Sequence, residues 1–387
     1  MTKAKKSKNK ITPLTKGSID YIIVIVVTLL VSLGLIMVLS ASSATALSES
    51  GDSYRYFKRQ LEAVIIGIVL LVIVSKIDYR IYRKLKWLGY GIIVALLFAV
   101  GFIGMSSGGA TRWINIAGFN FQPSEVAKVI LIVFFASLLT DLIEQGKIKN
   151  LFKGCIYPLI FLVPVIIAVF GLQNHMSATL VICMVSVIQM LIAGVRFRHF
   201  ALLGGVGLLG GLATLKMVGV SLTSGAGGFR MNRIKTWLDP FADITGDGWQ
   251  IVQSLYAIGS GGAFGAGLGQ SRQKYLYLPE PQNDFIFAVL AEELGYIGCL
   301  MVIALFLILI WRGIVISMKA RDTFGSLIAI GVTTLIGIQA LINIAVVTGT
   351  MPVTGMELPF FSYGGTAMMC NLILVGLLLN VSRTAKK

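Results

Sequence analysis

The sequence predicts an all-α integral membrane protein with about ten transmembrane helices and a long outer loop between spans seven and eight. Three observations predict this class. Hydrophobic residues make up 56% of the 387 residues, and the mean hydropathy is +0.86. Only 13% of the residues are charged, and the apolar residues fall in runs long enough to cross a bilayer. This composition excludes a soluble enzyme.

The apolar runs divide the chain into a basic tail, a membrane domain and a short end. Residues 1–19 carry six lysines and predict a cytoplasmic tail, and residues 383–387 predict a cytoplasmic C-terminus. The first span, 21–41, ends in small residues, but its roughly twenty apolar residues exceed a signal-peptide core, so we expect an uncleaved anchor. Within the single membrane domain, 20–382, the other spans are predicted at 61–75, 88–105, 123–141, 155–172, 176–194, 199–221, 284–311, 323–348 and 363–381.

The basic residues predict the orientation of these spans. Of the 33 lysines and arginines, 22 fall on the side that holds both termini, 9 fall on the other side, and 2 lie within spans. Because cytoplasmic loops carry the excess of positive charge, both termini are predicted to be cytoplasmic. Residues 222–283 then form a large extracytoplasmic loop, and loops of this length are usually functional. The basic residues are spread over many short loops, so nucleic acid is not an expected partner.

A stretch from Lys274 to Gly295 places three carboxylates, Asp284, Glu292 and Glu293, in or beside the membrane. At helical spacing Glu292 falls about 80° round from Asp284 and roughly 12 Å along the axis. A charge at the bilayer centre costs roughly 2.5–3.5 kcal/mol on insertion scales, so such groups are usually paired or functional. The alternative is that Asp284 or its neighbour Asn283 simply caps the helix.

Other charged residues lie near the same predicted outer surface. Glu125 and Lys128 are three residues apart at the start of a span, so they can pair on one helix face. Arg112 is the only basic residue in its loop, and arginine binds phosphate through two parallel hydrogen bonds. Arg230 and Arg233 could add a second basic face, although anchoring at the membrane interface is an alternative explanation.

The cysteines and histidines do not predict a metal site. The four cysteines occur singly, without the spacing of metal ligands or of a disulfide framework. His175 and His199 are predicted at opposite sides of the membrane, so they cannot share one site. We therefore expect no metal-binding residues among them.

A set of motifs follows in a fixed order along about residues 20–382. The motifs read Arg112-Trp-Ile, Phe121-Gln-Pro-Ser-Glu125-x-x-Lys128, Gln250-x-x-Gln-Ser254-x-x-Ala-x-Gly-Ser-Gly-Gly262, Gly267-x-Gly-x-Ser271, Leu278-Pro-Glu280, Asp284-Phe-Ile-Phe-Ala, Glu292-Glu-Leu-Gly295, Pro352-Val-Thr-Gly and Leu358-Pro-Phe-Phe-Ser362-Tyr-Gly-Gly365-Thr. Together they resemble the SEDS family (shape, elongation, division and sporulation). The stretch from Gly267 to Lys274 is more similar to the FtsW-like division branch, or to its sporulation relative, than to RodA.

The resemblance implies a peptidoglycan glycosyltransferase that polymerises lipid II on the outer face of the bacterial cytoplasmic membrane. It implies undecaprenyl-linked glycan and a class B penicillin-binding protein as partners, beside membrane lipids. It makes Asp284 the catalytic carboxylate. A divalent cation, Mg²⁺ or Mn²⁺, could share the charge of the leaving pyrophosphate. The residues that the resemblance implies to line the substrate cleft are Arg112, Glu125, Lys128, Arg230, Lys274, Ser362, Tyr363, Gly364 and Gly365.

The chain differs from many members of this family at two places, and the sequence also leaves other functions open. Many relatives carry His-Thr where this chain has Gln282-Asn283, and many carry an acid in the loop that here contains His175. The rival is a transporter that flips lipid II or another polyprenyl lipid, because intramembrane charges and interrupted spans also suit transport. A third hypothesis is an assembly scaffold without catalysis, and the presence of Asp284 argues against it.

Overall fold

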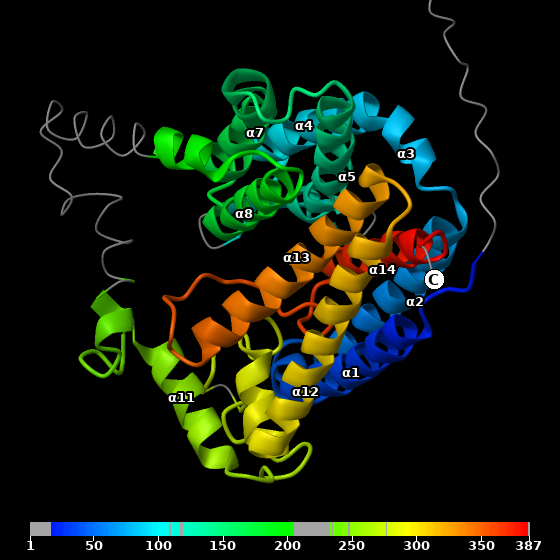
Figure 1. Cartoon of the computed structure of the whole chain (residues 1–387). Coiled ribbons are helices and arrows are strands. Elements are labelled where there is room, and N and C mark those ends of the chain that lie inside the picture. Colours follow the sequence, from blue (N-terminus) through cyan, green and yellow to red (C-terminus); the bar gives the residue numbers. More distant parts are fainter. Residues whose placement is uncertain are drawn as a thin grey trace, which may run out of the picture.

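The computed structural model describes residues 17–107, 110–116, 119–204, 233, 235–246, 248–275 and 277–385. It is a helical bundle with one small sheet (Figure 1). Its elements are α1 Tyr21–Ser50, α2 Arg55–Lys76, α3 Arg80–Lys84, α4 Lys86–Ile103, β1 Met105–Ser107, β2 Ala110–Ile116, β3 Phe119–Phe121, α5 Pro123–Glu144, η1 Leu151–Ile156, α6 Tyr157–Ile160, α7 Leu162–Ile166, η2 Ile167–Leu172, α8 Met176–Ile192, α11 Trp249–Gly261, α12 Ile286–Lys319, α13 Thr323–Val347 and α14 Gly365–Ser382.

The helices confirm a multi-pass membrane protein. In the described part of the chain, six helical stretches are long and apolar enough to cross a membrane: Tyr21–Ser50, Pro123–Glu144, Leu151–Leu172, Ile286–Lys319, Thr323–Val347 and Gly365–Ser382. Shorter apolar helices are α4 and α8. Most of the predicted span 199–221, and Arg230, lie outside the described residues.

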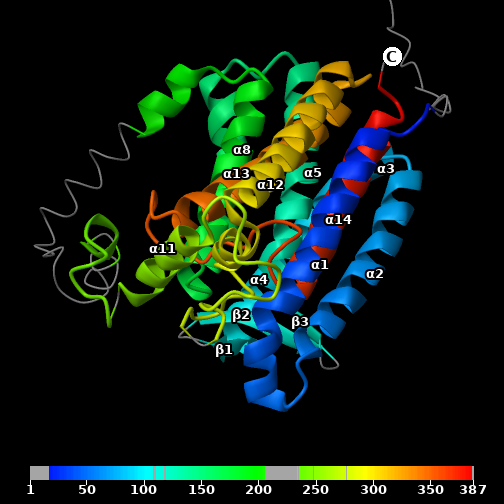
Figure 2. The ribbon, with the colours of Figure 1, turned by 90° about the horizontal axis from the view of Figure 1, so that it is seen from below.

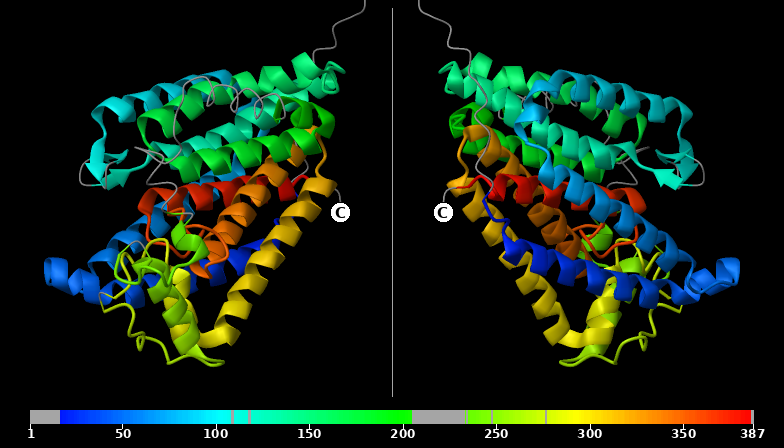
Figure 3. Two further views of the ribbon diagram at one scale, coloured as in Figure 1. Left: turned by 90° about the vertical axis from the view of Figure 1, so that its left-hand side faces the viewer. Right: turned by 90° about the vertical axis from the view of Figure 1, so that its right-hand side faces the viewer.

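The helices pack in two groups with α13 between them (Figure 1). One group contains α1, α2, α12 and α14, with α14 lying along α2, and the other contains α4, α5 and α8 (Figure 2). The sheet lies at one end of the bundle, and the C-terminus lies at the opposite end (Figure 3). There the amide of Gly17 donates to the carbonyl of Arg383 at 3.1 Å, so the two described chain ends meet.

Local chemistry explains where several helices begin. The Asp20 carboxylate accepts bonds from the amides of Ile22 and Ile23 and so caps α1. Pro123 is the first residue of α5, a position where the amide makes no hydrogen bond within the helix, so a proline there costs no bond. The Asp322 carboxylate caps α13 through the amide of Gly325 at 2.7 Å.

Helix α12 bends at Gly295, which has a left-handed φ of 68°. The bend breaks the regular helical hydrogen bonds, and the loop after α11 replaces them. The amide of Tyr296 donates to the carbonyl of Gly262 at 2.9 Å, and the amide of Gly267 donates to the carbonyl of Glu293 at 3.0 Å. The residues before the bend are therefore a separate short helix, held against the glycine-rich loop.

The sheet and α11 were not predicted. Strands β1, β2 and β3 pair antiparallel in that order, with Ile114 opposite Phe121. The β2 sequence is rich in β-branched and aromatic residues, which favour strands, but it is too short and polar for a hydropathy argument. Helix α11 lies within the predicted outer loop, and its Ser254 hydroxyl donates to the carbonyl of Val347 at the end of α13 at 2.7 Å.

Candidate functional site

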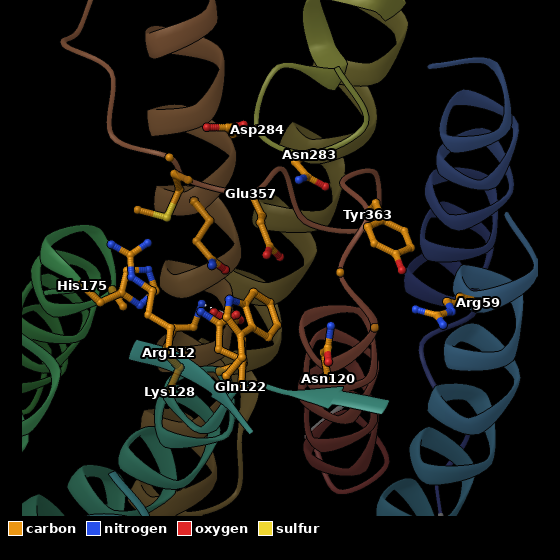
Figure 4. A pocket seen from close by; sticks show the side chains of 18 of the residues that line it. Arg59, Arg112, Asn120, Gln122, Lys128, His175, Asn283, Asp284, Glu357 and Tyr363 are labelled. Carbon is orange, nitrogen blue, oxygen red and sulfur yellow. Dashed lines mark ion pairs between the residues drawn. The ribbon is translucent and has the colours of Figure 1, made fainter. Parts of the chain in front are cut away.

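A cavity of about 790 Å³ lies near the sheet end of the bundle (Figure 4). Its walls come from α2, the three strands, the start of α5, the start of α8, the turn before α12, α13 and the loop before α14. Charged and amide side chains dominate the lining. The lining residues are Arg59, Glu62, Met105, Arg112, Trp113, Asn120, Gln122, Glu125, Lys128, His175, Ala178, Asn283, Asp284, Gln339, Gly355, Met356, Glu357, Tyr363, Gly364 and Gly365.

Asp284 lines this cavity from the turn that precedes α12. The N-cap position of α12 is Phe285, which makes no side-chain cap bond, so the capping alternative is not supported. The Asn343 side chain on α13 donates to the backbone carbonyl of Asp284 at 2.7 Å and to that of Met356 at 2.6 Å. It therefore ties the turn to the loop before α14. Burial raises the pKa of the Asp284 carboxyl to about 6.

The predicted helical relation between Asp284 and Glu292 is wrong. Asp284 lies ahead of the helix, so helical spacing does not relate the two acids. The Glu292 carboxylate instead accepts bonds from the Ser271 hydroxyl and from the amide of Arg272, the latter at 2.9 Å. Glu292 is thus satisfied within the loop and is not among the cavity-lining residues.

Glu357 is a cavity residue that the sequence analysis missed. Its carboxylate packs against Gly364, where an added Cβ would come within 2.8 Å of Oε2. Burial raises the pKa of the Glu357 carboxyl, and the nearby charge of Glu125 raises it further. A lone acid inside an apolar loop rich in proline and glycine was the signal that could have identified it.

The predicted pairing of Glu125 and Lys128 is confirmed. The Lys128 ammonium lies 2.7 Å from the Glu125 carboxylate, and each residue is 6% exposed. Both residues also line the cavity. The pair supplies one buried positive and one buried negative charge at the first turns of α5.

Removing one member of this pair should cost more stability than removing both. Glu125→Gln leaves the buried Lys128 ammonium without a carboxylate partner, and Lys128→Met leaves the buried Glu125 carboxylate without a cation. Each substitution should therefore lower the free energy of unfolding by roughly 3–5 kcal/mol. The double variant should cost less than the sum. A double-mutant cycle of thermal unfolding measures the difference, and strictly additive losses would contradict a direct pair.

Arg112 and His175 form the wall on the β2 side. Arg112 donates through Nη2 to the carbonyl of Asn174 at 2.8 Å, while its Nε has no hydrogen-bond partner in the described structure. The Nδ1 atom of His175 lies 3.4 Å from the hydroxyl of Ser124. Burial, with the positive charges of Arg112 and Lys128, lowers the pKa of His175 to about 3. The imidazole is therefore neutral at physiological pH.

The predicted loop before α14 contributes Tyr363, Gly364 and Gly365 to the cavity, while Ser362 lies behind it. The Ser362 hydroxyl accepts a bond from the amide of Leu358 at 2.8 Å. The Gln60 side chain donates to the carbonyl of Ser362 at 3.1 Å and accepts from the amide of Gly364 at 3.2 Å. Ser362 thus supports the loop from within.

The structure gives Lys274 a different place from the one expected. Lys274 is 2% exposed and is not among the cavity-lining residues. Its ammonium lies 3.1 Å from the Glu293 carboxylate and donates to the carbonyl of Gly269 at 2.6 Å. Glu293 also accepts a bond from the Ser40 hydroxyl of α1 at 2.6 Å. These contacts join the loop to α12 and α1.

The described residues contain no group of three or more His, Cys, Asp or Glu side chains arranged to hold a metal ion. Asp284 and Glu357 line one cavity, but they are two carboxylates without a third protein ligand. A divalent ion there would depend on oxygens of the substrate, as Mg²⁺ often does when it binds with phosphates.

The fold and the cavity define a polytopic membrane protein whose ionisable residues gather in a polar cavity at one end of its bundle. A family model described as cell cycle protein, FtsW/RodA/SpoVE, matches residues 20–387. The chain belongs to this family.

Similar proteins cover nearly the whole chain. Stage V sporulation protein E of Bacillus subtilis is 42% identical over 374 residues, which are 96% of this chain and 99% of that protein. The probable peptidoglycan glycosyltransferase FtsW of Geobacter sp. strain M18 is 39% identical over 366 residues, 94% of this chain and 96% of that protein.

Solved structures share the fold. One similar chain comes from a structure described as "Structural coordination of polymerization and crosslinking by a peptidoglycan synthase complex". It has a TM-score of 0.75 and 27% identity, and the match covers 94% of this chain and 98% of the solved chain. Thermus thermophilus RodA has a TM-score of 0.66 at 24% identity, and the match covers 95% of this chain and 98% of the RodA chain.

Proposed function

We propose that this protein is a peptidoglycan glycosyltransferase that polymerises lipid II into glycan strands at the outer face of the bacterial cytoplasmic membrane. One observation carries the proposal: Asp284 lines the same polar cavity as Arg112 and Lys128. In a sugar transfer from a pyrophosphate lipid, a carboxylate can serve as general base and the two cations can stabilise the leaving pyrophosphate. The activity in the names of the relatives supports the same function.

In this mechanism Asp284 is the general base. The 4-hydroxyl of the acceptor GlcNAc gives its proton to the carboxylate as its oxygen bonds to the anomeric carbon of the donor MurNAc. The bond from that carbon to the pyrophosphate breaks, and undecaprenyl pyrophosphate leaves. Arg112 has hydrogen-bonding capacity free for the developing negative charge, because its Nε has no partner in the described structure. Lys128 adds positive charge, which Glu125 partly offsets.

The pKa of Asp284 sets the expected dependence on pH. The group lies ahead of α12, and its pKa is raised to about 6. Below that pH the carboxyl keeps its own proton and cannot accept another, so kcat/KM should rise from pH 5 to about 7 with a midpoint near 6. Initial rates of polymerisation across this range test it, with the melting temperature followed in parallel. A flat profile from a stably folded protein would contradict the assignment.

The rival proposal is a transporter that flips lipid II. It needs a polar path through both leaflets, whereas the polar cavity lies near the sheet end of the bundle. The deciding experiment places the purified protein, with a class B penicillin-binding protein, in vesicles containing fluorescent lipid II. Glycan polymer without movement of lipid between leaflets supports the proposed function. Movement of lipid without polymer would favour transport.

We further propose ten spans with both termini in the cytoplasm. The 22-to-9 asymmetry of basic residues supports this topology, as does the meeting of Gly17 and Arg383 at one end of the bundle. A reporter fused after Lys387 should be cytoplasmic, and one inserted near Gly246 should be external. An accessible-cysteine or reporter-enzyme assay distinguishes these sides. A cytoplasmic signal at Gly246 would overturn the topology.

The proposed partner is a class B penicillin-binding protein. The solved peptidoglycan synthase complex that resembles this chain couples polymerisation with crosslinking, which supports such a partnership. Relatives of both the division and the sporulation type resemble the chain over nearly its whole length. We propose a role in one of these two processes.

A further inference from the structure

Two buried glutamines in the cavity wall have no hydrogen-bond partner for their side chains. Gln122 lies at the start of α5 and is 4% exposed, and Gln339 lies on α13 and is 3% exposed. Both line the cavity, and Gln122 is among the cavity residues labelled in Figure 4. The Oε1 atom of each is buried and unpartnered, and neither side-chain Nε2 bonds to another described residue. We call these two side chains the cavity amides.

Two buried glutamines outside the cavity, Gln173 and Gln189, also have an unpartnered Oε1 atom, but their Nε2 groups are hydrogen-bonded. The side-chain Nε2 of Gln189 donates to the carbonyls of Ile132 and Leu327 at 3.1 and 3.0 Å, and that of Gln173 donates to the carbonyl of Leu97 at 2.8 Å. These glutamines join backbone segments and do not line the cavity. Because buried polar groups are normally hydrogen-bonded, two amides without any partner in one cavity indicate groups that bind a ligand.

We infer that the cavity amides bind an acetamido group of the saccharide substrate. This inference rests on the proposed function, which provides a substrate whose two sugars carry acetamido groups. In a trans acetamido group the N–H and the carbonyl point in opposite directions, so one cavity amide can donate from Nε2 to the carbonyl while the other accepts the N–H at Oε1. The amides are neutral, whereas Arg112 and Lys128 suit the charged pyrophosphate. The cavity thus offers neutral groups for the sugar as well as charged groups for the leaving group.

The first test replaces each cavity amide with methionine, which is similar in size and lacks hydrogen-bonding groups. Gln339→Met and Gln122→Met should not lower the melting temperature, because no bond within the protein is lost. Their kcat/KM should fall about 10-fold to 100-fold. The control is Gln189→Met, which should lower the melting temperature and leave kcat/KM for lipid II unchanged. A lowered melting temperature with unchanged kcat/KM for the cavity variants would overturn the inference.

The second test changes the substrate. Lipid II analogues with hydrogen in place of one acetamido group, on either sugar, remove the proposed partner without adding charge. Wild-type protein should use one such analogue about 10-fold to 100-fold less efficiently than lipid II, and Gln339→Met or Gln122→Met should lose this discrimination. A variant that remains equally discriminating would show that the amide binds something else, such as a hydroxyl group, and would overturn the acetamido assignment.

A binding measurement distinguishes failure of this inference from failure of the proposed function. If wild-type protein makes no polymer, the proposed function fails. The inference is then read from the rise in melting temperature that lipid II produces in wild-type protein. The rise should be smaller when wild-type protein binds the lipid II analogue that lacks the recognised acetamido group. It should also be smaller when Gln339→Met or Gln122→Met protein binds lipid II. Equal rises in all these samples would overturn the inference.

Discussion

Purified Asp284→Asn protein should insert, fold and bind its partner normally, yet polymerise lipid II about 10²-fold to 10⁴-fold more slowly than wild-type protein. The amide has the shape of the carboxyl group but cannot accept the proton of the attacking hydroxyl. The contact that positions this turn is the bond from Asn343 to the backbone carbonyl of residue 284, which the substitution leaves intact. The measurement is the initial rate of glycan formation beside a thermal melt.

A matched control is Asp243→Asn, the same substitution in the outer segment and away from the cavity lining. The Asp243 side chain accepts a bond from the amide of Gly246 at 3.0 Å, which an asparagine oxygen can still accept. This control should retain full activity. Near-normal polymerisation by stable Asp284→Asn protein would remove Asp284 from the chemistry and reopen the transporter proposal.

Breaking the buried ion pair between Lys274 and Glu293 should strongly destabilise the protein. Both side chains are at most 3% exposed, and their charged atoms lie 3.1 Å apart. Glu293→Gln leaves a buried ammonium with only neutral partners, so it should cost about 3–5 kcal/mol, and Lys274→Met should cost a similar amount. The double variant Lys274→Met with Glu293→Met should cost less than the sum. Thermal unfolding in detergent measures all three.

Lys58→Met provides the control for burial. Lys58 pairs with Asp52 at 2.9 Å, a similar distance, but the Lys58 side chain is 64% exposed. Its loss should barely change the melting temperature, because water already solvates both charges. If Glu293→Gln were as harmless as Lys58→Met, the ion pair would not be what holds the loop from Gly269 to Lys274 against α12 and α1.

Several helix boundaries could be predicted because they depend on local chemistry. The predicted spans 123–141 and 323–348 match α5 and α13 closely, since Pro123 and the capping Asp322 mark their first turns. The Glu125–Lys128 pair was equally local, because three-residue spacing brings side chains together on any helix. The sheet and α11 were missed because they are polar or short and have no apolar run to mark them.

The sequence by itself determined the membrane class, the approximate bounds of several spans and the family, and it singled out Asp284, whose catalytic role stays a prediction. Only the tertiary structure decided which charges from different elements meet. Asp284, Glu357 and Gln339 come from a turn, a loop and a helix, and they share one cavity because these elements pack together. Lys274 and Glu293 lie 19 residues apart in the sequence, and they meet because the loop after α11 packs against α12 beside the bend at Gly295. Spacing along a chain fixes directions within one helix, whereas contacts between elements follow from how their faces pack.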